Sequence, residues 1–217
     1  MIYKAIIFDM DGLLLDSERI ALSTFVESCR ENNFEPDINV YNKCIGTTSY
    51  ATKEILLNGY GRDFPFEMIS ELWKKKYLNE VLNKPVPLKP GALSLLQHLE
   101  KEGIKKVVVT STDYELAIRK LTNAQIVHFF KFVLGRDQVL NGKPNPEIYL
   151  TACRKLGENP INCLALEDSD NGVLAAFNAG LTVIQVPDLV EPSAKVKALD
   201  HWIVKSLVEA TAVLDTR

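Results

Sequence analysis

The sequence has no long run of apolar residues and no excess of charge of either sign. A membrane-spanning helix needs about 20 apolar residues in succession, and acidic residues interrupt the N-terminal stretch where a signal peptide would need an unbroken apolar segment. The net charge is −3 and the basic residues are spread along the chain, which gives no electrostatic footprint for nucleic acid. We therefore expect neither a membrane protein nor a nucleic-acid-binding protein.

Cysteine and histidine are both rare. The four cysteines are Cys29, Cys44, Cys153 and Cys163. Their spacing fits neither a disulfide framework nor a metal site, so we expect reduced thiols in a cytoplasmic protein. The three histidines are scattered and lie in no motif, which disfavours serine–histidine and zinc–histidine chemistry.

The chain of 217 residues is 47% hydrophobic and 24% charged, enough for one large domain or a domain with an insertion. The run Ala5–Phe8 reads as a strand that is covered on both faces. Asp9 and Asp11 follow it, and residues two apart on an extended chain point the same way. Gly12 lets the backbone turn away at once. Asp and Gly also form ordinary turns after strands, so this stretch alone leaves function and turn equally open.

The next segment, to about Leu82, has the spacing of helices only. One helix is predicted to start near Ser17, a second near Thr48 with its end at Gly59, and a third around Pro65. The apolar stripes of these helices are typical of a core rather than of a cofactor pocket.

The pattern changes after the proline-bearing stretch 83–91. Helices that end in glycine alternate with the apolar strands "KVVVT", "CLALED" and "TVIQVP". This alternation predicts an α/β fold with right-handed crossovers and a parallel sheet, which the first strand must join. We expect residues 1–14 and 86–217 to form this core, and residues 15–85 to be an inserted, all-helical domain.

Polar side chains gather where the predicted strands end, the edge at which open parallel sheets bind ligands. The residues at or close to this edge are Asp9, Asp11, Thr110, Ser111, Thr112, Lys143, Glu167 and Asp168. Each alone could be a helix cap or a solvated turn residue. Their joint placement on one edge argues for a site.

The set of side chains is chemically coherent. Crowded carboxylates repel one another unless a cation lies among them, and oxygen ligands without His or Cys suit Mg²⁺. Hydroxyl groups and one lysine supply what a phosphoryl group needs. The chain has no "GxxxxGK[ST]" phosphate loop. An aspartate that attacks phosphorus and forms an aspartyl-phosphate is therefore the natural candidate for catalysis.

Four motifs in this order, "FDMDGLLLDSE", "VVVTST", "GKPNPEIY" and "LEDSDNG", resemble the haloacid dehalogenase (HAD) superfamily. More narrowly, they are similar to its beta-phosphoglucomutase-like phosphatases. The match spans the predicted core, and the position of the helical insertion agrees with the small mobile cap of this family. The resemblance implies a Rossmann-like, HAD-like core with an all-helical cap.

The resemblance also implies roles for individual residues. Asp9 would be the nucleophile and Asp11 the general acid/base. Thr110, the amide of Ser111 and Lys143 would hold the phosphoryl oxygens.

The same resemblance implies a Mg²⁺ site. Its ligands would be the side chain of Asp9, the backbone carbonyl of Asp11 and the side chain of Asp168. Glu167 would be a fourth ligand or a close partner.

Three alternatives follow from the comparison with the family. Dehalogenases lack the second aspartate, so Asp11 favours phosphate esters. Beta-phosphoglucomutases carry a histidine at the position of Ala21 and an arginine in the loop that corresponds to residues 45–54, and this chain has neither. A non-catalytic binding protein would not need all the motif residues. We expect a monomeric phosphatase of a small phosphorylated metabolite, with sugar phosphates, polyol phosphates and nucleoside monophosphates all open.

Overall fold

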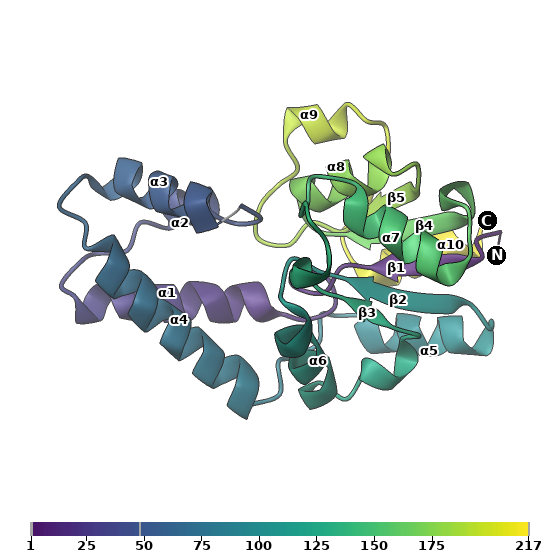
Figure 1. The fold of residues 1–217 in the computed structure, drawn as a ribbon, viewed down its shortest axis with the longest axis horizontal. Helices are drawn as coiled ribbons and strands as arrows, with labels where there is room; N and C mark the ends of the chain where they lie inside the picture. Colours follow the sequence, from purple (N-terminus) through teal and green to yellow (C-terminus); the bar gives the residue numbers. More distant parts are fainter. Residues whose placement is uncertain (1, 48, 217) are drawn as a thin grey trace.

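The computed structural model describes residues 2–47 and 49–216. Its centre is one sheet of six parallel strands in the order β3-β2-β1-β4-β5-β6 (Figure 1). The strands are β1 (Ala5–Phe8), β2 (Lys105–Val109), β3 (Val133–Leu134), β4 (Cys163–Glu167), β5 (Thr182–Gln185) and β6 (Trp202–Ile203). The predicted α/β class with a parallel sheet is confirmed, and the predicted first strand lies between β2 and β4.

Helices cover both faces of this sheet. They are α5 (Ala92–Lys101), α6 (Tyr114–Asn123), α7 (Glu147–Leu156), α8 (Asp170–Asn178), α9 (Ala194–Lys197) and α10 (Leu207–Asp215), with 3₁₀ turns η1 (Val127–Phe129), η2 (Arg136–Gln138) and η3 (Pro160–Asn162). Ile6 and Phe8 of β1 pack with α5, α6 and α10, whereas Ala5 and Ile7 pack with α7 and α8. Alternate side chains of a strand point to opposite faces, so β1 is apolar throughout because it is buried on both sides.

The remaining helices lie beside the sheet (Figure 1). They are α1 (Ser17–Glu31), α2 (Ile38–Asn42), α3 (Ser49–Tyr60) and α4 (Phe66–Asn83), and we call them together the four-helix segment. The predicted start of a helix at Thr48 lies outside the described residues. Helix α2 was not predicted, because its five residues are too few to show an apolar period; the Asp37 side chain accepts from the amide of Asn39 at 2.8 Å and starts it.

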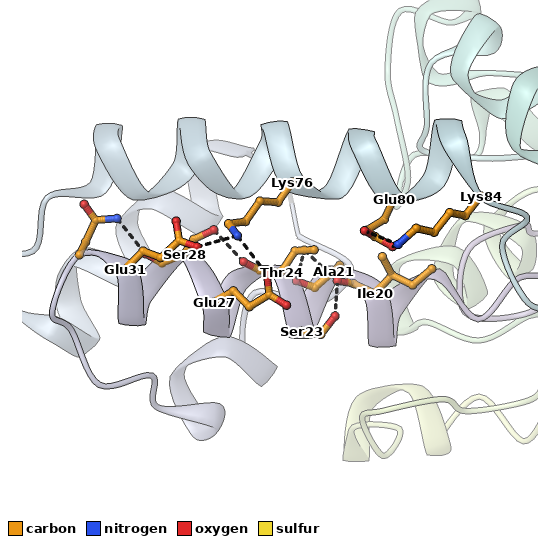
Figure 2. Close-up of polar contacts among 11 residues, drawn as sticks. Ile20, Ala21, Ser23, Thr24, Glu27, Ser28, Glu31, Lys76, Glu80 and Lys84 are labelled. Atoms are coloured by element: carbon orange, nitrogen blue, oxygen red, sulfur yellow. Dashed lines mark hydrogen bonds and ion pairs between the residues drawn. The ribbon is translucent and has the colours of Figure 1, made fainter.

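The four-helix segment has an apolar cluster of its own. The ring of Phe25 lies 5.0 Å from the ring of Tyr41 and 5.1 Å from that of Trp73, measured between centroids. Polar contacts also join α1 to α4: Lys76 donates to Glu27 at 3.0 Å and pairs with Glu31 at 2.8 Å (Figure 2).

The two chain passages between the sheet and the four-helix segment run side by side. The amide of Asp16 donates to the carbonyl of Pro87 at 2.8 Å, and that of Lys89 donates to Leu14 at 2.9 Å. The proposed division into a core (1–14 and 86–217) and an inserted domain (15–85) stays a prediction. Within the described part of the chain, no helix is both long and apolar enough to cross a membrane.

Candidate active site

A pocket of about 230 Å³ lies at the carboxyl ends of β1, β2 and β4. The sheet side contributes Asp9, Asp11, Thr110, Ser111, Thr112, Lys143, Asp168, Ser169 and Asn171. The four-helix segment and its loop contribute Glu18, Ile45, Gly46, Thr47 and Tyr77. The structure thus brings seven of the eight residues predicted for the strand ends to one pocket, and the eighth, Glu167, is buried directly behind it.

The chain turns sharply after β1 and so places its two aspartates. Asp9 continues the strand, since its amide donates to the carbonyl of Leu166 in β4 at 2.9 Å. Gly12 has a φ of +83°, which favours glycine. A Cβ atom at this position would also collide with the carboxylate of Asp168. Gly12 is therefore needed both for the turn and for the close approach of Asp168.

Three carboxylates form a cluster at the floor of the pocket. One oxygen from each of Asp9, Glu167 and Asp168 lies within 4.8 Å of the others. Lys143 donates to Asp9 at 2.5 Å and to Glu167 at 2.5 Å. The hydroxyl of Tyr149 also donates to Glu167. One lysine thus faces three acidic groups, and the cluster has more negative charge than this lysine balances.

The pKa values in the cluster reflect burial first and this surplus of negative charge second. Burial raises the pKa of Asp9 to about 8, even though the charge of Lys143 lowers it, and the neighbouring Glu167 raises it further. Burial, together with the charges of Asp9 and Glu167, raises the pKa of Asp168 well above its ordinary value. Burial disfavours the charged form of Lys143, but its two carboxylate partners outweigh this and raise its pKa.

The donor set fits a hard divalent cation. All three groups of the cluster offer carboxylate oxygens, and a cation among them would offset both the burial and the mutual repulsion that raise the pKa values of Asp9 and Asp168. Asp9 and Asp168 line the pocket, whereas Glu167 is fully buried and already accepts from Lys143 and Tyr149. Asp9 and Asp168 are therefore the better placed ligands, with Glu167 as a partner that fixes Lys143.

The side chain of Asp11 lies in a different environment. It accepts from the hydroxyl of Ser17 at 2.5 Å, from that of Thr112 at 2.7 Å, and from the ammonium group of Lys120. Burial alone would raise its pKa, but the charge of Lys120 and these hydrogen bonds outweigh burial and lower it. The expected role of the Asp11 backbone carbonyl as a metal ligand stays a prediction.

The predicted phosphate-binding groups lie at the end of β2 and beside it. Thr110 is buried, and its hydroxyl oxygen accepts from the amide of Thr112 at 3.0 Å. The hydroxyl hydrogen of Thr110 thus remains available as a donor. Ser111 and Lys143 line the same pocket. Their part in phosphate binding stays a prediction.

Several residues of the site were not predicted from the sequence, among them Lys120, Tyr77 and Glu18. Lys120 of α6 is fully buried, and a signal existed, because it lies between Ala117 and Leu121 on the apolar face of that helix. Tyr77 belongs to the apolar stripe of the helix predicted around Pro65, which is typical of a core, whereas it lines the pocket. Glu18 also faces the pocket, and burial together with the charge of Asp11 raises its pKa to about 7.

Comparison with known proteins agrees with this geometry. The model of the haloacid dehalogenase-like hydrolase family matches residues 6–186. The chain is 32% identical over 212 residues to "Putative phosphatase YhcW" of Bacillus subtilis (strain 168), covering 97% of this chain and 95% of that protein. It is 29% identical over 183 residues to "Phosphorylated carbohydrates phosphatase" of Thermotoga maritima, covering 82% of each.

Among solved structures, beta-phosphoglucomutase from Clostridium difficile superposes with a TM-score of 0.74 at 22% identity, covering 95% of this chain and 92% of that one. At this identity the likeness concerns the fold alone.

The chain belongs to the haloacid dehalogenase-like hydrolase family. Its fold agrees with the narrower beta-phosphoglucomutase-like type that the sequence motifs indicated. The expected enzyme class, a phosphomonoester hydrolase, agrees with the family match and with the phosphatase names of the relatives.

Proposed function

We propose that this protein is a Mg²⁺-dependent phosphatase that hydrolyses a small phosphomonoester, a sugar phosphate or a similar metabolite, through an aspartyl-phosphate. The observation that carries the proposal is the arrangement at the end of β1. There Asp9 lies in a carboxylate–lysine cluster that faces the pocket, and Asp11, two residues later, is held by separate donors.

The two aspartates divide the reaction between them. The negative charge of the bound substrate favours a protonated Asp11, although the pKa of Asp11 is lowered in the free protein. In the first half, the Asp9 carboxylate attacks phosphorus, the bond from phosphorus to the ester oxygen breaks, and Asp11 gives that oxygen its proton. In the second half, Asp11 takes a proton from a water molecule that attacks the phosphorus. The bond from phosphorus to Asp9 then breaks, and inorganic phosphate leaves with Asp9 restored.

The other residues of the pocket bind and orient. Thr110, Ser111 and Lys143 hold the phosphoryl oxygens, with the lysine kept in place by Glu167. Asp9 and Asp168 would hold Mg²⁺, which supplies positive charge that offsets the negative charge of the phosphoryl group.

A phosphatase fits this pocket better than a mutase does. A beta-phosphoglucomutase-type reaction is the second candidate, because the fold is shared with such an enzyme. However, Ala21 does not line the pocket; it faces a separate hollow beside Trp73, whose indole donates to the Ala21 carbonyl at 2.8 Å. Among the described lining residues there is neither histidine nor arginine. We therefore propose that phosphate is released to water.

The pocket favours a small, neutral leaving group. Lys143 is the one cationic side chain among the described lining residues, and it is engaged by two carboxylates. The name of the Thermotoga maritima relative, a phosphatase of phosphorylated carbohydrates, agrees with such a substrate. A monomer in the cytoplasm remains the expectation from sequence.

A panel of phosphorylated metabolites tests the proposal, with phosphate release measured with Mg²⁺ and with excess EDTA. We expect turnover of at least one sugar or polyol phosphate with Mg²⁺, and none after chelation until Mg²⁺ is restored. Full activity in excess EDTA would show that the reaction does not need a metal ion. Rapid conversion of beta-glucose 1-phosphate to glucose 6-phosphate, with little free phosphate and a trace of the bisphosphate present, would favour the mutase.

A further inference from the structure

Lys120 is a fully buried lysine that the mechanism above does not use. It lies on α6, and its side chain has no exposed surface. Lysine is almost never fully buried unless it is paired, because its ammonium group loses its hydration. The position of this charge therefore needs an explanation beyond the packing of α6 against the sheet.

The partners of Lys120 lie at the pocket. Its ammonium group donates to one oxygen of Asp11 and, at 2.9 Å, to the hydroxyl of Tyr77. It also lies 5.5 Å from the centroid of the Tyr77 ring. Asp11 and Tyr77 both line the pocket. Lys120 thus contacts two residues that line the pocket, Asp11 of the sheet region and Tyr77 of helix α4.

Lys120 completes a set of donors that fixes the Asp11 carboxylate. Ser17 donates to the same oxygen as Lys120, and Thr112 donates to the other oxygen. These donors come from the start of α1, from α6 and from the loop after β2. With hydrogen bonds to both oxygens, the carboxylate is held in one orientation.

Helices α4 and α6 are joined at a second point. The side-chain amide of Asn123 in α6 donates to the carbonyl of Leu82 in α4 at 3.0 Å. The contact of Lys120 with Tyr77 is therefore part of a continuous junction between these helices, and it connects Asp11 to the four-helix segment.

We propose that Lys120 is a positioning residue that holds Asp11 in its reactive orientation, and that Tyr77 ties this orientation to helix α4. The inference rests on the proposed role of Asp11 as general acid/base. An Asp11 carboxylate that turns away from the ester oxygen neither gives it a proton nor activates water. A good leaving group needs little protonation, so the loss depends on the substrate.

Lys120→Met tests this, because methionine keeps most of the length of the side chain and removes the charge. We expect the rate of phosphorylation in a single turnover to fall about 100-fold or more with glycerol 3-phosphate, and less than about 10-fold with p-nitrophenyl phosphate. The substrate concentration that gives half of this rate should change little, since Lys120 does not line the pocket. After a pulse of acetyl phosphate, phosphoenzyme should also persist longer than in the unchanged enzyme.

Lys106→Met is the matched control. Lys106 is also a buried lysine with a carboxylate partner, Glu100, but it lies at the start of β2, away from the strand ends. The same substitution there should leave the ratio of the two rates unchanged. If Lys120→Met lowers both rates equally, or lowers neither, the inference is wrong.

Tyr77→Phe covers the case in which Lys120→Met does not fold. It keeps the ring and the lysine and removes only the hydroxyl that receives the hydrogen bond. We expect the ratio of the rates for p-nitrophenyl phosphate and glycerol 3-phosphate to rise about 3- to 10-fold. An unchanged ratio would show that the Tyr77 hydroxyl does not affect Asp11, and the proposed link between Asp11 and helix α4 would be wrong. If the unchanged enzyme hydrolyses no compound of the panel above with Mg²⁺, the proposed function fails instead; if another sugar or polyol phosphate is hydrolysed and glycerol 3-phosphate is not, that compound replaces glycerol 3-phosphate in these comparisons.

Discussion

The sheet region and the four-helix segment contribute to the pocket in different ways. The sheet region supplies the carboxylate cluster, its lysine and the hydroxyl groups at the strand ends. The four-helix segment supplies Glu18 and otherwise neutral side chains. In the proposed mechanism the reacting groups thus follow the strand ends, whereas the four-helix segment would form the wall that faces the leaving group.

The two regions also differ in how they are held together. The sheet is buried between two extensive apolar clusters, whereas the four-helix segment has one smaller cluster and several exposed ion pairs between its helices (Figure 2). Regions with less buried apolar surface open at lower free energy than the global unfolding. We therefore expect catalysis and stability to respond separately to changes in the two regions.

The largest effect is expected at the strand end. Asp9→Asn replaces the proposed nucleophile by a neutral amide, and we expect turnover to fall by roughly 10⁴-fold or more. The fold should survive, because the carboxyl group that is removed has a raised pKa and is costly to bury in its charged form. Steady-state kinetics measure the turnover, and a thermal melt measures the stability of the fold. An Asp9→Asn variant with near-normal turnover would contradict the mechanism. So would a phosphoryl group transferred from acetyl phosphate to any residue other than Asp9.

A pair of phenylalanines compares the stability of the two regions. Phe25 in the four-helix segment and Phe8 in β1 are both fully buried. Replacing either by alanine should lower the free energy of unfolding of its own region by about 3–5 kcal/mol, through lost contacts and a cavity. Hydrogen exchange should accelerate only within 17–83 for Phe25→Ala, and throughout the chain for Phe8→Ala. The same exchange pattern in both variants would show that the two regions unfold as one unit.

A pH series probes the carboxylate cluster without changing any residue. The raised pKa of Asp9, about 8, means that protons compete with Mg²⁺ below that pH. Affinity measured by calorimetry should rise with pH up to at least about pH 8, by up to about tenfold per pH unit for each proton displaced. Without Mg²⁺ the folded state binds more protons than the unfolded state, so stability should fall as the pH rises towards 8. Affinity that is constant from pH 6 to 8 would contradict the raised pKa.

The sheet and its site were largely predictable because their signals are local. Strands buried on both faces are apolar without interruption, as in "AIIF" and "VVV", and the parallel arrangement then brings the residues after them to one edge. Short elements left no such signal. The strands β3 and β6 have two residues each, and their pairing depends on a sheet that already exists.

The walls of the pocket were not predictable for a related reason. Tyr77 has the helical spacing of a core residue, and only the packing of α4 beside α6 places its hydroxyl next to Lys120. Asp16 directly precedes α1 and is a residue type that often caps helices, yet its side chain makes no cap hydrogen bond and instead accepts from Arg19. Such pairings depend on tertiary contacts, and a local pattern contains no information about them.

The smallest effect is expected on the surface of the four-helix segment. Lys76 of α4 pairs with Glu27 and Glu31 of α1 (Figure 2), but all three side chains are partly or largely exposed. Solvent screens such pairs and ordering long side chains costs entropy, so they contribute little. Lys76→Met should shift the melting temperature by about 2 °C or less, and the shift should shrink further in 1 M salt as screening increases. A shift as large as that of Phe25→Ala, measured under the same conditions, would show that these ion pairs rather than the apolar cluster hold α1 against α4.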